Sequence, residues 1–185
     1  MPSIRTLPLA AMAAAMLLLA PTPAMAHPGH GLEVSGGLMA GFLHPLTGLD
    51  HLASLVLAGV WAAVLGGRAL VRLPAALLAG MVAGFVLAPA VGSTIAEGLA
   101  AAATVALIGV AALRIKAPLP VASAACAVFG FGHGLAHGLE VAGSAPAFAS
   151  GMVASSFLLL MVGMGGARLA LQSGAHSRQS PQLRR

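Results

Sequence analysis

Charged residues are rare in five long apolar runs, and this pattern constrains the fold more than any other feature of the chain. The runs cover residues 46–67, 73–91, 94–113, 119–139 and 147–171. Each has about 20 residues, the length that an α-helix needs to cross a hydrocarbon core. Only 7% of the whole chain is charged, whereas soluble domains carry about 25%. The sequence therefore predicts an all-α, polytopic transmembrane helix bundle whose solvent is the lipid bilayer.

Residues 1–26 have the features of a cleaved secretory signal peptide. Arg5 gives a basic start, residues 7–20 are apolar, and the sequence Ala-Met-Ala before His27 matches a signal peptidase site. An uncleaved first helix is the alternative. Cleavage leaves a periplasmic segment over residues 27–35, a helix bundle over residues 36–171 and a disordered tail over residues 172–185.

Basic residues predict how often the chain crosses the membrane. They follow the first and third runs and follow or end the fifth: Arg68, Arg72, Arg114, Lys116, Arg168, Arg178, Arg184 and Arg185. The positive-inside rule places such residues in the cytoplasm, and five spans with an outside N-terminus satisfy it. Residues 36–44 are apolar but too short to cross, so we expect a half-helix there. The alternative of six spans would put every basic cluster outside.

These features favour a multi-pass protein of the bacterial inner membrane with a periplasmic N-terminus and a cytoplasmic C-terminus. The net charge of +5 does not indicate a nucleic-acid partner, because the chain has no Tyr and only one Trp to stack on bases. A single cysteine, Cys126, excludes an intramolecular disulfide and a CxxC metal site. The sequence leaves homo-oligomerisation open.

Ionisable residues are concentrated in two short motifs within the apolar runs, at residues 44–51 and 131–140. Together the motifs hold four of the seven histidines and two of the four acidic residues: His44, Asp50, His51, His133, His137 and Glu140. An ionisable group at membrane depth is costly unless it is paired or bound. The two motifs therefore predict a functional site.

Spacing shows how the motifs could meet. His133 and His137 are four residues apart on one helix face, and Glu140 continues that stripe. Pro45 is expected in the first turn of a helix, with His44 at its entrance, and Asp50 either binds a metal ion or orients an imidazole. Because the first span runs inward and the fourth outward, both motifs should lie at periplasmic ends.

Imidazole and carboxylate groups without thiolate suit Ni, Co, Zn or Cu(II) better than Cu(I), Mg or Ca. His27 and His30 of the predicted mature N-terminus are candidates for capturing the metal, with an incidental flexible terminus as the alternative. Small residues beside the motifs should let the helices approach closely: Gly41, Gly48, Gly130, Gly132, Gly134 and Gly138.

The two motifs resemble those of the HupE/UreJ family of hydrogenase and urease accessory proteins. The family's H-P-x-x-G-x-D-H segment and its later histidine/glycine/glutamate segment are matched by His44, Pro45, Gly48, Asp50, His51, His133, His137, Gly138 and Glu140. The resemblance covers essentially the whole chain. It implies a secondary permease for nickel, or sometimes cobalt, that serves nickel enzymes.

We therefore expect a permease rather than an enzyme, moving Ni²⁺, or alternatively Co²⁺ or Zn²⁺, from periplasm to cytoplasm. No Walker motif is present in the sequence, so ATP would not drive it. Two other functions fit the residues. One is a membrane-embedded metal-dependent hydrolase, in which the bound metal activates water. The other is a metal-binding accessory protein that carries nothing across.

Overall fold

The computed structural model describes residues 37–91, 93–113, 115–141 and 143–179, and only the backbone of residues 49, 50, 93, 112 and 174–179. The predicted signal peptide and the capture residues His27 and His30 lie outside this part of the chain. The described residues are helical and belong to one compact unit. In chain order the helices are α2 (Leu38–Thr47), α3 (Leu49–Leu65), α4 (Ala69–Leu87), the short 3-10 helix η1 (Ala88–Ala90), α5 (Ser93–Ala112), α6 (Leu119–Gly138) and α7 (Ala145–Gln179).

The predicted all-α membrane bundle is confirmed. Four segments are long and apolar enough to cross a bilayer, and they correspond to α4 with η1, to α5, to α6 and to α7. The pair α2 and α3, bent by 79° at the break between them, supplies a fifth crossing if it is counted as one span. Large apolar side chains on the outside of these helices are exposed, among them Val71, Val86, Val105, Val128 and Val162. Such a surface is suited to lipid rather than to water.

The prediction for the first apolar run is wrong in one respect. Pro45 was expected to begin a helix with His44 before it, but both residues lie inside α2, and the helices break at Gly48 instead. Gly48 has an extended backbone (φ −95°, ψ 117°) and lies between α2 and α3. Since proline removes one backbone donor and strains the turn before it, α2 ends within a few residues of Pro45. His44 therefore projects from the last turn of α2.

The end of α7 also differs from the expectation of a disordered tail over residues 172–185. This helix continues to Gln179, and the residues after it lie outside the described part of the chain. No proline occurs over residues 172–179, so an existing helix gains one backbone hydrogen bond for each residue added there.

Glycines on α4 and α6 bring the backbones of these two helices into contact. A Cβ atom placed on Gly134 of α6 would lie 2.0 Å from the carbonyl oxygen of Met81, and one placed on Gly84 of α4 would lie 2.1 Å from that of Phe131. Ordinary contacts of a Cβ atom begin at 3.4 Å, so no larger residue fits without moving a helix. The same holds at Gly80, Gly130 and Gly138. This packing confirms the predicted role of small residues in α6.

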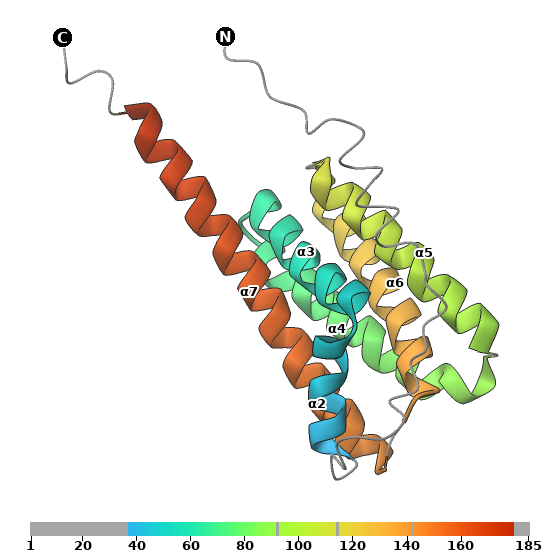
Figure 1. Ribbon diagram of the computed structural model, residues 1–185. Coiled ribbons are helices and arrows are strands. Elements are labelled where there is room, and N and C mark those ends of the chain that lie inside the picture. The colour runs from blue at the N-terminus through green and yellow to red at the C-terminus, as the bar shows by residue number, and fades with distance from the viewer. Residues whose placement is uncertain (1–36, 92, 114, 142, 180–185) are drawn as a thin grey trace. The chain divides into compact units, whose positions relative to one another are not determined.

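A second glycine-lined contact holds α2 and α3 against α7, which passes both helices in Figure 1. Gly41 of α2 and Gly59 of α3 face backbone atoms of Phe148 and Leu160 on α7. Gly151 and Gly163 of α7 face α2 and α3 in return. The histidine motif on α2 and α3 is thereby fixed against α7, while the motif on α6 is fixed against α4.

The apolar core lies between α3, α4, α5, α6 and α7, around the buried side chains of Trp61, Leu73 and Leu107. The indole nitrogen of Trp61 donates a hydrogen bond of 2.8 Å to the carbonyl oxygen of Ile115, in the connection between α5 and α6. This bond satisfies the one polar atom of the Trp61 side chain. It also ties the far end of α3 to that connection.

Candidate metal-binding site

The two sequence motifs meet where α2 ends, α3 begins and α6 ends. His44 lies in the last turn of α2 and His51 in the first turn of α3, because the break at Gly48 separates them. His133 and His137 lie on successive turns near the end of α6. All four imidazoles form one cluster, with each ring centre between 4.5 and 6.4 Å from those of its neighbours.

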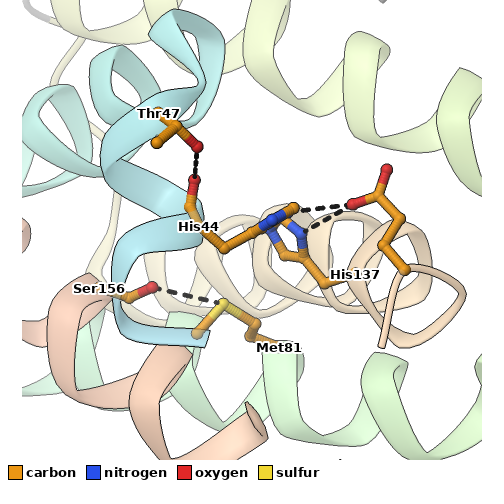
Figure 2. A network of polar contacts seen from close by, with 6 residues as sticks. His44, Thr47, Met81, His137 and Ser156 are labelled. Atoms are coloured by element: carbon orange, nitrogen blue, oxygen red, sulfur yellow. Dashed lines mark hydrogen bonds and ion pairs between the residues drawn. The ribbon is translucent and has the colours of Figure 1, made fainter. Parts of the chain in front are cut away.

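Glu140 joins this cluster although it lies just beyond α6. The chain turns there, since the backbone N–H of Glu140 donates to the carbonyl oxygen of His137 (3.1 Å). One carboxylate oxygen, Oε2, lies 3.0 Å from Nε2 of His44 and 3.7 Å from Nδ1 of His137. Figure 2 shows the two imidazoles turned toward this shared oxygen.

Three of these groups are close enough to hold one metal ion. One ligand atom from each of His44, His137 and Glu140 lies within 4.8 Å of the others. Two ligands at about 2.1 Å from an ion can be at most about 4.2 Å apart. Small side-chain movements would therefore bring all three onto a common centre. We call His44, His137 and Glu140 the outer group.

The three side chains of the outer group differ in how far they are exposed. The side chains of Glu140 and His44 are 39% and 25% exposed, whereas that of His137 is 3% exposed. The Nδ1 atom of His137 is buried and makes no hydrogen bond with the described part of the chain. A buried nitrogen without such a bond is unusual, and a metal ion would satisfy it.

Glu140 contributes a negative charge to the outer group at neutral pH. The imidazoles of His137 and His44 hold the pKa of the Glu140 carboxyl below its usual range. Glu140 is therefore a carboxylate, which attracts a cation and offers it an oxygen ligand. The nearby imidazoles supply nitrogen ligands, so the set suits a divalent transition metal.

His51 and His133 lie beside the outer group, and His133 is one helical turn before His137 in α6. The ring of His51 is 4.5 Å from that of His137 and 5.5 Å from that of His133. The Nδ1 atom of His133 lies 2.9 Å from the carbonyl oxygen of Phe129, one turn earlier in α6. Its Nε2 atom lies 3.2 Å from the hydroxyl oxygen of Thr104 in α5.

The hydroxyl groups of Ser54 and Thr104 lie beside the cluster of imidazoles. Ser54 of α3 donates a hydrogen bond of 3.1 Å to Oγ1 of Thr104, and both side chains are buried. Thr104 in turn donates to the carbonyl oxygen of Ala100 at 3.0 Å. An internal space of about 10 Å³ adjoins the Ser54 side chain. The residues that line it are Ser54, Leu55, Leu77, Met81, Leu107, Phe129, His51, His133 and His137. It can hold about one water molecule or ion.

Aromatic and sulfur-containing side chains support the cluster from α4 and α7. Phe148 of α7 packs against the ring of His44 at 5.6 Å and is stacked on Phe85 of α4. Ser156 of α7 points its hydroxyl at the sulfur of Met81, 3.8 Å away (Figure 2). These contacts limit how far the imidazoles can move.

Five of the six predicted site residues lie together: His44, His51, His133, His137 and Glu140. Asp50 is part of α3, but its side chain lies outside the described part of the chain. Sequence reasoning missed Thr104 and Phe148. Thr104 could have been noticed as a polar residue in the middle of an apolar run, whereas Phe148 carries no such signal.

Two comparisons with known proteins find a match to this chain. The family model described as HupE / UreJ protein matches residues 14–181. The chain is also 36% identical over 157 residues to Protein HupE of Rhizobium leguminosarum bv. viciae, a match that covers 80% of this chain and 78% of the relative. No solved structure matches the chain. The matched region includes both histidine motifs.

Proposed function

Since this chain belongs to the HupE/UreJ family of membrane proteins, we propose that it is a secondary permease that carries Ni²⁺ from the periplasm to the cytoplasm. The observation that carries the proposal is that His44 of the first motif and His137 of the second motif both lie against one carboxylate oxygen of Glu140. The cation is the cargo in this proposal, and the cluster replaces part of its hydration shell.

Binding begins at the exposed side of the outer group. Glu140 and His44 are accessible there and lower the cost of removing water from the ion. His137 then supplies a buried third ligand. Neutral imidazoles bind without adding charge, and one carboxylate offsets only part of the charge of a divalent ion. Binding is therefore weak enough to be reversed, as transport requires.

The distribution of basic residues supports inward transport. The cluster lies where α3 begins and α6 ends, whereas Arg68, Arg72 and Lys116 lie at the opposite ends of the helices. The positive-inside rule assigns those ends to the cytoplasm and the cluster to the periplasm. A membrane potential of 100 mV, negative inside, would draw a divalent cation inward with about 4.6 kcal/mol.

The family supports nickel over other divalent ions, because its members are accessory proteins of nickel enzymes. Imidazole and carboxylate ligands would also accept Co²⁺ or Zn²⁺. We propose an indirect link to a nickel enzyme: the permease supplies the ion, and other proteins insert it.

The test is uptake of radioactive nickel in cells that lack their own nickel importers. Wild-type protein should restore uptake, and His137→Ala and Asp50→Ala should abolish it at equal protein levels in the membrane. Ser173→Ala is a matched control at the other end of α7, where the hydroxyl donates a hydrogen bond of 3.0 Å to the carbonyl oxygen of Leu169 in the same helix. Equal uptake with and without the wild-type protein, despite correct insertion, would rule out nickel transport.

A further inference from the structure

We infer that the cargo has a second, inner position on its path, between His51 and His133, and that the hydroxyl group of Thr104 holds His133 ready for it. This inference rests on the proposed function. Two residues outside the motifs distinguish this position. Thr104 of α5 contacts His133, and Ser54 of α3 donates a hydrogen bond to Thr104.

The spacing of the inner imidazoles fits a shared ion. The ring centres of His51 and His133 are 5.5 Å apart. Two imidazoles that bind one ion at about 2.1 Å have ring centres about 5 to 6 Å apart. Both side chains line the internal space of about 10 Å³, which can hold about one ion or water molecule. His137 lines it as well and is thus in reach of both positions.

The hydrogen bonds of His133 determine which nitrogen would bind the ion. A carbonyl oxygen only accepts hydrogen bonds, so the contact of 2.9 Å with Phe129 requires a hydrogen on Nδ1. In the neutral ring, Nε2 then carries the lone pair. That atom lies 3.2 Å from the Thr104 hydroxyl, which can donate its hydrogen to the lone pair.

The Thr104 hydroxyl can give up its hydrogen bond to that lone pair at little cost in free energy. This hydroxyl has one hydrogen and two acceptors in range, Nε2 of His133 and the carbonyl oxygen of Ala100 at 3.0 Å. When a cation takes the Nε2 lone pair, the hydrogen turns fully to Ala100, and no buried donor is left unpaired. The bond from Ser54 keeps the Thr104 oxygen in place in both arrangements.

The inner position lies beside the Ser54–Thr104 pair, and the apolar core around Leu107, Trp61 and Leu73 lies beyond that pair. A cation held there has left the outer group and is about one helical turn, or about 6 Å, further inward.

A binding experiment tests the inner position independently of transport. Purified full-length protein that carries His44→Ala and Glu140→Gln, and so lacks two ligands of the outer group, is titrated with Co²⁺ and followed by its visible absorption. We expect this variant to retain one Co²⁺ with nitrogen ligands. Adding Thr104→Val, which keeps the shape but removes the hydroxyl, should weaken binding about tenfold. Absence of any bound Co²⁺ in the double variant would overturn the inner position.

An uptake experiment tests the role of Thr104 as a positioning residue. In cells that express the full chain, Thr104→Val should lower the maximal rate of nickel uptake about tenfold and leave the half-saturating concentration unchanged, because the outer group is intact. Thr104→Ser should restore most of the rate. The control is Ser155→Ala, which removes a buried hydroxyl that donates a hydrogen bond to the carbonyl oxygen of Met152 within α7.

Each result has one meaning. Wild-type uptake by Thr104→Val, or equal losses in Thr104→Val and Thr104→Ser, would overturn the positioning role. If the wild-type protein carried no nickel at all, the proposed function would fail, and the Co²⁺ titration would still decide whether the inner position exists.

Discussion

Nε2 of His44 lies 3.0 Å from Oε2 of Glu140, so the last turn of α2 and the turn after α6 meet through one polar contact. These residues belong to different motifs on helices that pack against different partners, α7 and α4. The contact brings a nitrogen and an oxygen ligand to the exposed side of the outer group. The first two predictions concern this group, and the other two concern the helices that support it.

His44→Ala and Glu140→Gln should each weaken Ni²⁺ binding by about tenfold or more, about 1.4 kcal/mol each. The double variant should be only slightly weaker than either single variant, because the two side chains act on the same ion. Equilibrium dialysis of the purified proteins with radioactive nickel measures the three affinities. Fully additive losses would mean that His44 and Glu140 bind independently, against the outer group as one site.

Ni²⁺ should raise the melting temperature of the wild-type protein but not that of His137→Ala. A ligand that binds only the folded state at 100 times its dissociation constant adds about 2.7 kcal/mol of stability. His137 supplies the buried ligand atom of the outer group, so its loss should remove most of this gain. Thermal unfolding in detergent, with Mg²⁺ as the control ion, provides the measurement. An equal upward shift in both proteins would place nickel elsewhere.

Gly134→Ala should destabilise the bundle and disturb the site, whereas Gly109→Ala should do neither. A Cβ atom at position 134 would lie 2.0 Å from a backbone oxygen of α4, while one at position 109 of α5 would meet nothing within 4 Å. The helices would have to separate, and the imidazoles of His133 and His137 would shift with α6. Melting temperature and nickel uptake of the two variants give the comparison. Similar values for both would show that α4 and α6 tolerate the added methyl group.

Trp61→Phe should lower the stability of the protein without changing its affinity for nickel. The variant loses the donor of the 2.8 Å bond to Ile115, and a lost hydrogen bond of this kind costs about 0.5 to 1.5 kcal/mol. Trp61 lies in the half of α3 that is remote from His51, so the outer group should be unaffected. Denaturant unfolding followed by circular dichroism, together with nickel dialysis, tests both parts. A reduced affinity with unchanged stability would contradict this assignment.

The sequence by itself determined that this protein lies in lipid, which segments form helices and which motif residues share a helix face. Hydropathy shows which segments cross the bilayer, because each span must be apolar over its whole length. Helical periodicity places His133 and His137 on one face, and both residues lie in the cluster. These properties depend on neighbours in the chain, so they can be read from local patterns.

Only the tertiary structure decided which residues from different helices touch. The contact of His44 with Glu140, the support from Phe148 and the hydroxyl of Thr104 behind His133 all depend on how closely and at what rotation the helices pack. That packing arises where glycine backbones meet a facing helix, as at Gly134. The position of Pro45 inside α2 has the same origin, since the contact of α2 with α7 holds that turn helical. Such choices are made by non-local contacts between helix surfaces, and no local pattern records them.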